Sequence, residues 1–417
     1  MQFPAPAGVV FSDTATSITR TGVAMKALSR KLTVITLMVL AGWYADATAQ
    51  EQGPPPGFYQ NPMQVDPADY LDRIKLPPGF RISIYASGLT APRSMAMSKN
   101  GTLFVGTLGP FGMPAVGKVY AVRDNNGDHK ADEIITIASG LNYPNGVALH
   151  DGALYVAEIG RILRYDDIEA NLHHPPAPVV VTDDYPKEYH HGWKYIHFGP
   201  DGKLYVPVGA PCNVCVPDAN HGVITRINPD GTGKEVFARG IRNSVGFDWN
   251  PETGVLWFAD NGRDVMGNDI PPEELNRAPV PGLNFGYPYR YGKDLVDPMF
   301  KTDMKPEDFT PAVLEMPAHR APLGIQFYTG DSFPGEYKNQ LFIAHHGSWN
   351  KNPPDGYRVS LARIRDGKVV SYEDFATGWL INGRFWGRPV DLEIMHDGSM
   401  LVSDDFANVI YRISYEK

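Results

Sequence analysis

Short apolar stretches, each opened by a turn residue, recur along most of the chain. In six places a glycine or asparagine is followed closely by a β-rich apolar run. These units are Gly101-Thr-Leu-Phe-Val, Gly152-Ala-Leu-Tyr-Val, Gly202-Lys-Leu-Tyr-Val, Gly254-Val-Leu-Trp-Phe, Asn339-Gln-Leu-Phe-Ile and Gly398-Ser-Met-Leu-Val. Their first residues lie 51, 50, 52, 85 and 59 positions apart. A period near 50 with several short strands per unit predicts an all-β fold, a six-bladed β-propeller.

A second strand, alternating and usually containing an arginine, follows most of these units. The runs are Lys118-Val-Tyr-Ala-Val, Arg161-Ile-Leu-Arg-Tyr, Val223-Ile-Thr-Arg-Ile, Arg358-Val-Ser-Leu-Ala-Arg-Ile and Val409-Ile-Tyr-Arg-Ile. A β-sandwich or two stacked β-domains would not explain six copies of one unit. In a propeller the loops between blades surround one end of the channel, where we expect the ligand site. The long spacing, roughly 261 to 338, holds about 30 extra residues that we expect to shape a pocket mouth or an interface.

The first 49 residues have the form of a secretory signal peptide. Basic residues near position 30 precede an apolar run from Leu32 to about Ala45, and Ala47-Thr48-Ala49 is a small-x-small cleavage site. The run is about 14 residues long, against the roughly 20 that a spanning helix needs, so we expect cleavage. An uncleaved membrane anchor is the alternative.

These features divide the chain into a signal peptide at 1–49, a linker or N-terminal arm at 50–75 and a propeller at 76–417. Met25 is a plausible true start, which would make 1–24 an artefact of start assignment. After cleavage near Ala49 we expect a periplasmic or secreted protein with no membrane span in the mature chain.

The charge balance is acidic. The net charge is −9, and removal of residues 1–49, which carry four basic and two acidic residues, makes it −11. Such a chain is a poor nucleic-acid binder, so we expect no nucleic-acid partner. An anionic ligand must be held by a local cluster of Arg and Lys, because the overall field repels it.

The chain has two cysteines, Cys212 and Cys215. In an oxidising compartment the default for this pair is a local disulfide, which would stiffen a turn. A redox-active pair and half of a metal site are the alternatives, although no second cysteine pair exists to complete a zinc site.

Two kinds of residue in the expected blade loops point to chemistry. His191 precedes a turn and a strand, and we interpret it as the proton acceptor of an oxidoreductase; a solvated or structural histidine is the alternative. Arg242, Lys351, Arg384 and Arg388 precede or follow predicted strands, and together they would bind a polycarboxylate. Taken singly, each is more simply a surface ion pair.

Two loops are rich in oxygen ligands. Asp124, Asn126, Asp128 and Asp132 have the spacing of a calcium loop but lack the glutamate at position 12, so a second calcium site and a polar hairpin turn both remain open. The segment Asp260-Asn261-Gly262-Arg263-Asp264 is either a calcium site or a solvated acidic loop.

In their order and spacing these motifs resemble the soluble quinoprotein sugar dehydrogenases, the group that contains soluble glucose dehydrogenase and sorbosone dehydrogenase. The resemblance covers roughly residues 76–417. It rests on His191 before Gly199-Pro200-Asp201, Arg242-Asn243 before Gly246, Asn261-Gly262-Arg263, Asn284-Phe285-Gly286-Tyr287-Pro288, His346-Gly347-Ser348-Trp349-Asn350 and Gly387-Arg388-Pro389-Val390-Asp391.

The resemblance implies a six-bladed propeller that uses pyrroloquinoline quinone (PQQ) with calcium. It implies that His191 is the general base and that Arg242 and Asn243 contact the quinone. The backbone carbonyls of Gly262 and Arg263 would ligate the calcium of the cofactor.

The same resemblance implies that Arg388 pairs a cofactor carboxylate, with Lys351 as a further contact. Two departures separate the chain from the glucose enzyme: Val245 stands where that pattern has a glutamine, and the substrate-side glutamine near Pro144-Asn145-Gly146 is absent. The motifs are closer to the sorbosone-type branch.

We therefore predict PQQ- and calcium-dependent oxidation of a sugar or sugar-derived aldehyde, with a cytochrome or quinone as external electron acceptor. A calcium-dependent lactonase-like propeller and a non-catalytic binding propeller are the alternatives. No G-x-G-x-x-G follows a strand, which argues against a nicotinamide site.

Overall fold

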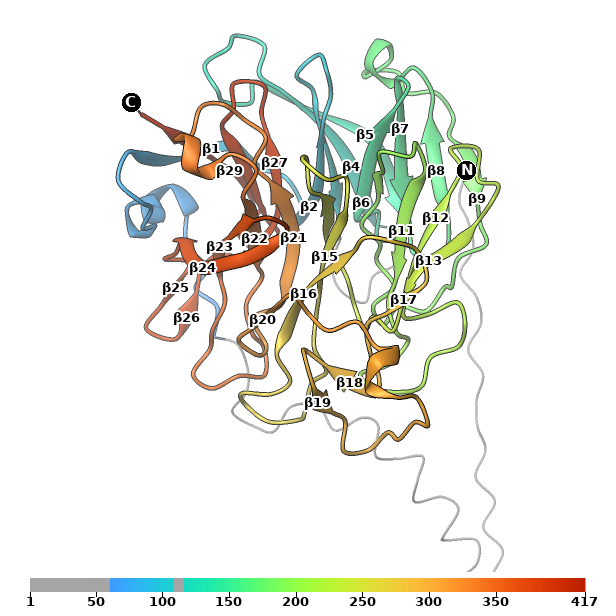
Figure 1. The fold of residues 1–417 in the computed structure, drawn as a ribbon. Coiled ribbons are helices and arrows are strands. Elements are labelled where there is room, and N and C mark those ends of the chain that lie inside the picture. The colour runs from blue at the N-terminus through green and yellow to red at the C-terminus, as the bar shows by residue number, and fades with distance from the viewer. Residues whose placement is uncertain (1–60, 109–115, 417) are drawn as a thin grey trace, which may run out of the picture. The chain divides into compact units, whose positions relative to one another are not determined.

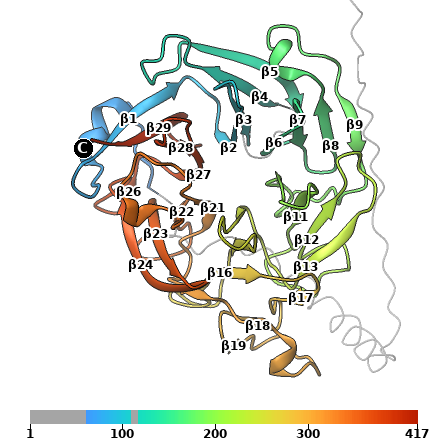
Figure 2. The same cartoon turned by 45° about the horizontal axis from the view of Figure 1, so that its top comes forward.

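The computed structural model describes residues 61–108 and 116–416, and these residues form almost entirely β-structure. Six sheets, each containing four antiparallel strands, stand around a common centre like the blades of a propeller (Figures 1 and 2). The predicted six-bladed β-propeller is therefore confirmed.

Five blades follow one another in chain order, and a sixth combines both ends of the fold. Their strands are β2 (Pro92–Met97), β3 (Leu103–Thr107), β4 (Gly117–Arg123) and β5 (Glu133–Leu141); β6 (Gly146–His150), β7 (Ala153–Ala157), β8 (Ile162–Tyr165) and β9 (Val179–Thr182); β10 (His197–Phe198), β11 (Leu204–Val208), β12 (Val223–Ile227) and β13 (Glu235–Arg239); β14 (Phe247–Trp249), β15 (Leu256–Asp260), β16 (Glu273–Ala278) and β20 (Leu314–Met316); β21 (Pro322–Phe327), β22 (Leu341–His345), β23 (Arg358–Arg365) and β24 (Lys368–Ala376); and β27 (Pro389–Ile394), β28 (Met400–Asp404), β29 (Val409–Tyr415) and β1 (Phe80–Ser87).

Each of the six predicted turn-strand units is the second strand of a blade together with the turn that precedes it. The opening glycines have φ between 66° and 86°, and Asn339 has φ 59°. A Cβ atom disfavours this left-handed region, so glycine or asparagine is needed where the first strand turns into the second. Every residue of the second strands β3, β7, β11, β15, β22 and β28 is buried. Burial on both faces explains why the first three residues of each of these strands are apolar rather than alternating.

The two ends of the described fold lie in one sheet. Strand β1 pairs antiparallel with β29, from Phe80 opposite Tyr415 to Ser87 opposite Val409. The Phe80 ring packs edge-on against Phe333 and Phe375, with ring centroids 4.8 and 5.0 Å apart. Because this blade cannot form without both ends, its pairing closes the ring and gives the loops of all six blades fixed relative positions.

Shorter elements decorate the blades. They are η1 (Pro67–Arg73), η2 (Ile168–Ala170), η3 (Pro306–Asp308), η4 (Gly335–Tyr337), β17 (Leu283–Asn284), the hairpin β18 (Arg290–Tyr291) and β19 (Leu295–Val296), and the hairpin β25 (Leu380–Ile381) and β26 (Arg384–Phe385). The long spacing predicted as an insertion contains β17, which pairs parallel with β13, and the β18–β19 hairpin.

The predicted signal peptide at 1–49, its cleavage site and the candidate start at Met25 lie outside the described residues. In the predicted arm, η1 is capped by the Asp66 side chain, and two β-bridges, Pro62 with Phe385 and Lys75 with Thr377, attach it to the rest of the fold. None of the helices in residues 61–108 and 116–416 has the length and apolar character needed to cross a bilayer.

Candidate active site

A cavity of about 880 Å³ lies at the end of the propeller where the first strand of each blade begins and the second strand ends. The strands of a blade are antiparallel, so residues before the first strand and after the second lie at the same edge. The lining residues come from these positions in several blades: Arg93, Leu108, Tyr189, His190, His191, Trp193, Arg242, Asn243, Asn261, Gly262, Asp264, Glu273, His319, Ala321, Leu323, His346, Gly347, Trp349, Asn350 and Arg388.

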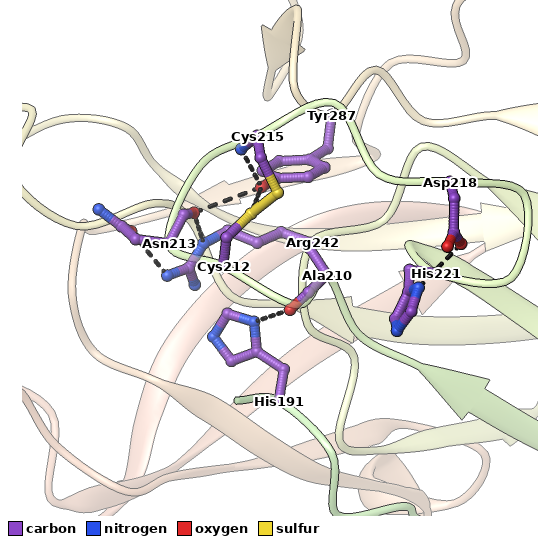
Figure 3. The surroundings of a disulfide bond; sticks show 9 residues. All are labelled: His191, Ala210, Cys212, Asn213, Cys215, Asp218, His221, Arg242 and Tyr287. Carbon is purple, nitrogen blue, oxygen red and sulfur yellow. Dashed lines mark hydrogen bonds and ion pairs between the residues drawn. A yellow bond between two sulfur atoms is a disulfide. The ribbon is translucent and has the colours of Figure 1, made fainter. Parts of the chain in front are cut away.

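His191 lies on the loop before β10, with φ 52°, and its side chain lines the cavity. Its Nδ1 is 2.8 Å from the carbonyl oxygen of Ala210 (Figure 3). A carbonyl only accepts, so Nδ1 carries the proton and Nε2 keeps its lone pair. A Cβ on Gly209 would lie 2.5 Å from His191 Cβ, so this close approach requires glycine. Burial, then the charge of Arg242, holds the pKa of His191 well below 6.5.

Arg242 is buried, and hydrogen bonds along the edges of its guanidinium hold it, two of them to Asn213 (Figure 3). Nε donates to the backbone oxygen of Asn213 at 2.9 Å, and Nη2 donates to Asn213 Oδ1 at 2.9 Å and to Asp264 Oδ2 at 3.0 Å. Nη1 donates to the carbonyl of Asn261 at 3.1 Å. Four of the five guanidinium donors are therefore engaged, which leaves one Nη1–H for a ligand.

Buried carboxylates support the turns that carry these residues. Asp260 accepts from the backbone N–H groups of Arg242 at 2.8 Å and Asn243 at 2.6 Å. Glu273 Oε2 accepts from the N–H of Gly262 at 2.7 Å. Burial raises the pKa of Asp260 to about 6 and that of Glu273 to about 7. Both side chains therefore act as turn supports, bonded to backbone groups at the cavity wall.

A second set of lining residues forms an ionic network. Asp405 accepts from His346 Nε2 at 2.8 Å and from Arg93 Nη1 at 2.8 Å. Arg388 donates from Nε to the carbonyl of His346 and from Nη2 to the carbonyl of Gly347, each at 3.0 Å. Burial, then the charge of Arg388, lowers the pKa of His346 to about 4. The network fixes Arg388 at the cavity, and three of its donors bond to no described residue.

Two of the four predicted cations do not line the cavity. Lys351 Nζ donates to the carbonyls of Asn268 and Ala318, each at 3.2 Å. Arg384 is exposed on the β25–β26 hairpin and donates to the carbonyl of Pro62 at 3.3 Å. The expectation that all four gather in one mouth is therefore corrected: Arg242 and Arg388 line the cavity, while the hairpin carries Arg384 to the N-terminal arm.

Of the two predicted calcium-binding positions in the 260–264 segment, one lines the cavity and the other does not. Gly262 lines the cavity, whereas Arg263 does not, and the guanidinium of Arg263 donates to Asp297 at 2.7 Å. Among the described residues, no donor reaches the backbone oxygen of Gly262 or Arg263. The two carbonyls thus remain available as oxygen ligands.

The predicted second calcium loop is the hairpin between β4 and β5. Asp124 accepts from three backbone N–H groups of the turn. Asp132 accepts from the N–H of Asn125, from that of Asn126, which it shares with Asp124, and from the Asn126 side-chain amide. Asp128 accepts from the N–H of Lys130 at 2.9 Å. No group of three or more His, Cys, Asp or Glu side chains in residues 61–108 and 116–416 could hold a metal. The described residues hold the hairpin by its own hydrogen bonds, and the second calcium site stays a prediction.

Cys212 and Cys215 form a disulfide, as predicted. Their turn follows β11 and contributes Asn213, which contacts Arg242 (Figure 3). Sequence reasoning assigned no role to Asn213, although it lies between the two cysteines.

Other cavity residues were also missed. Arg93 lies at the start of the first strand of its blade, and Arg242 and Arg388 lie shortly before the first strands of theirs. This shared position could have identified Arg93 as a cavity residue. His346 lay inside a recognised motif without a role. His319, whose Nε2 donates to the carbonyl of Gly267 at 2.7 Å, belongs to the insertion and had no local signal.

Comparisons with known proteins place these features in context. An uncharacterized protein from Borreliella burgdorferi is 36% identical over 379 residues, which cover 86% of this chain and 96% of the relative. A pyrroloquinoline quinone-dependent pyranose dehydrogenase from Coprinopsis cinerea is 24% identical over 337 residues, which cover 67% of this chain and 43% of that enzyme. This chain therefore spans less than half of the length of the pyranose dehydrogenase.

The fold has solved counterparts. The calcium structure of a Trichoderma reesei member of carbohydrate-active enzyme family AA12 superposes with a TM-score of 0.71 at 21% identity and covers 86% of this chain and 99% of that chain. The predicted resemblance is confirmed at the level of PQQ-dependent sugar dehydrogenases, without distinction between the glucose and sorbosone types. Residues 66–413 match the family described as a domain of unknown function, DUF7133. Because that match runs through all six blades and the cavity, the chain belongs to the DUF7133 family.

Proposed function

We propose that this chain is a PQQ- and calcium-dependent dehydrogenase that oxidises a sugar or a sugar-derived aldehyde. One observation carries the proposal: His191, with Nδ1 committed to Ala210, lines the same cavity as Arg242 and Arg388. The name of the Coprinopsis cinerea relative, a PQQ-dependent pyranose dehydrogenase, supports the choice of cofactor.

The residues of the cavity fit a planar tricarboxylate such as PQQ. Its volume of about 880 Å³ is in the range of small-molecule sites. Trp193 and Trp349 supply flat apolar surface, and Trp349 is 40% exposed. Arg388 has uncommitted donors that suit a carboxylate. The buried Oδ1 of Asn350 has no partner among the described residues and is available to a ligand.

Calcium fits the cavity less completely, through oxygen atoms of the backbone. The carbonyl oxygens of Gly262 and Arg263 are hard ligands of the kind that calcium prefers. A calcium ion also needs oxygen from its bound ligand here, since no cluster of acidic side chains surrounds these carbonyls in the described part of the chain. The calcium structure of the Trichoderma reesei relative supports this assignment.

When bound, the quinone would accept a hydride from the substrate, and calcium would polarise the quinone. The chain's own residues do the rest. His191 Nε2 takes the hydroxyl proton of the substrate, and such general-base assistance is typically worth about 10²–10⁴ in rate. The remaining Nη1–H of Arg242 and its positive charge stabilise negative charge that develops in the cavity. Burial and Arg242 keep His191 neutral at pH 7, ready to accept the proton.

The finer assignments belong to the same proposal. The order of the motifs favours a sorbosone-type substrate over glucose. Two electrons must leave the reduced cofactor, so an external cytochrome or quinone acts as acceptor. The signal-peptide pattern at 1–49 and the Cys212–Cys215 disulfide support an exported protein.

Reconstitution tests the proposal. Purified protein is loaded with PQQ and calcium, and dye reduction is followed with a panel of aldoses and sorbosone. We expect retained PQQ absorbance and dye reduction with at least one sugar. Protein that retains no PQQ and reduces no dye would exclude the function. A lactonase would need carboxylates clustered around one metal, and no observation in the described residues favours that candidate.

A further inference from the structure

The turn Cys212–Cys215 lies beside the arginine of the proposed site and is closed by a disulfide with Cα atoms 6.1 Å apart (Figure 3). A closed loop this short removes little entropy from the unfolded chain, so the bridge contributes little to overall stability. Its effect must be local, on the residues that it encloses.

Asn213, the first enclosed residue, binds Arg242 through two oxygens. Its backbone oxygen accepts from Nε at 2.9 Å and its Oδ1 accepts from Nη2 at 2.9 Å. This two-point contact resembles the bidentate grip of a carboxylate on an arginine. Unlike a carboxylate, however, Asn213 is neutral. It therefore orients the guanidinium plane without adding a negative charge to that of Asp264, the carboxylate in direct contact with Arg242.

Asn213 also attaches a second segment of the site. Its Oδ1 accepts from the N–H of Asp264 at 2.8 Å, and its Nδ2 donates to the carbonyl of Asp264 at 3.1 Å. Asp264 ends the segment that contains Gly262 and Arg263. One side chain thus links the arginine before β14 to the candidate calcium carbonyls after β15.

The turn is held from outside the bridge as well. The Tyr287 hydroxyl accepts from the N–H of Cys215 at 3.1 Å and lies 3.6 Å from Cys212 Sγ. The disulfide and this hydroxyl together constrain the backbone on both sides of Asn213. A turn free to unwind would move both oxygens away from Arg242.

We propose that Asn213 is a positioning residue for Arg242 and the 261–264 segment, and that the Cys212–Cys215 bridge maintains the turn that presents it. The inference rests on the proposed function for its catalytic consequence, but its structural content does not depend on PQQ.

The first test compares Asn213→Ala with a matched control, Asn228→Ala, in the β12–β13 hairpin, where the lost contact is to Thr232. We expect the Kd for PQQ with calcium, followed by fluorescence quenching, to rise about 10-fold in Asn213→Ala, in the range seen when supporting residues around a site are lost. The Asn228→Ala variant should bind like the wild type. Equal Kd values for all three proteins would overturn the inference.

The second test uses the fact that the chain has only two cysteines. A phosphine reductant should weaken PQQ binding by the wild type and leave the double variant Cys212→Ser/Cys215→Ser, already weak, unchanged. A wild type with unaltered affinity after complete reduction, confirmed by thiol titration, would remove the bridge from the proposal. This test needs no Asn213 variant to fold.

A crystal structure of the apoprotein separates this inference from the proposed function. In Asn213→Ala we expect the Arg242 guanidinium to be displaced or to occupy several positions. An unmoved guanidinium would refute positioning by Asn213 even if the enzyme were confirmed. Failure of the wild type to bind PQQ, with a displaced guanidinium in the variant, would refute the function and keep the positioning role.

Discussion

Two of the imidazoles that line the cavity, those of His191 and His346, are held in different ways. His191 donates to a backbone carbonyl, beside an arginine that a neutral amide orients. His346 donates to Asp405, which also binds Arg93. Burial alone would raise the pKa of Asp405, but His346, Arg93 and Arg388 hold it far below its usual range.

The difference separates residues free to react from residues that anchor. A neutral carbonyl orients His191, and the neutral Asn213 orients Arg242, although Arg242 also pairs with Asp264; His191 Nε2 and one Nη1–H of Arg242 remain available to a ligand. In the network around Asp405, opposite charges neutralise one another and hold the wall in place. Removing a member of the first set should reduce catalysis, and removing a member of the second should reduce stability.

The largest expected effect is on turnover. His191→Gln should lower kcat by about 10²–10⁴ while PQQ binding survives, because only the proton acceptor is lost. The matched variant His346→Gln should lower kcat by only about 10-fold, the lower end of the effect of a lost supporting residue. Steady-state kinetics on reconstituted protein decides. A larger loss of kcat in His346→Gln than in His191→Gln would indicate that His346, and not His191, is the catalytic base.

Next in size is the stability of the ionic network. Asp405→Asn leaves Arg93 and His346 without their buried partner and should lower the free energy of unfolding by about 3–5 kcal/mol. The control is Asp269→Asn, since the pair of Asp269 with Lys351 leaves Asp269 84% exposed and should contribute at most about 1 kcal/mol. Guanidinium chloride unfolding of the apoproteins measures both. Equal changes in the free energy of unfolding for the two variants would show that the network around Asp405 does not anchor the cavity wall.

A smaller effect is expected on PQQ binding, where an arginine that lines the cavity is compared with one that does not. Arg388→Met should weaken PQQ binding about 10–100-fold, the value of a hydrogen bond to a charged group. Arg384→Met should leave the Kd within about twofold, because Arg384 is exposed and contacts Pro62. Fluorescence titration with PQQ measures the Kd of both variants. An equal loss of affinity in Arg384→Met would show that Arg384 contributes to PQQ binding.

The smallest effect is the pH dependence of turnover. A base with its pKa near 6.5 would be about three-quarters protonated at pH 6. The pKa of His191 is lowered by burial and by Arg242, so its neutral form persists to lower pH and the acid limb of kcat should lie below pH 6.5. Turnover at pH 6 should therefore stay close to that at pH 7.5 in PQQ-loaded protein that remains folded. An acid limb above pH 6.5 would contradict the assigned surroundings of His191.

Much of the fold could be predicted because the blade unit is local. A left-handed turn residue followed by a wholly buried strand is a requirement of backbone geometry and burial, and both appear in the residues themselves. The disulfide was equally local, since Cys212 and Cys215 lie in one turn. The position of His191 and Arg242 at blade loops followed from the same repeat.

The candidate site was predicted only in part. Arg384 and Arg388 are four positions apart, yet only Arg388 lines the cavity, because Arg384 belongs to the β25–β26 hairpin and Arg388 follows that hairpin, just before β27. Arg93 and Asp405 pair across 312 residues, and no local pattern records such a pairing. Asn213 was overlooked because its importance lies in a contact with a different blade loop.

The amino-acid sequence by itself determined the number of blades, the turns that begin their second strands and the disulfide, and it pointed to His191 as the candidate base. These depend on interactions within a few residues or on burial of a repeated strand. The tertiary structure decided which arginines line the cavity and which charges cancel. Those depend on where closure of the ring, through β1 and β29, places side chains that lie far apart along the chain.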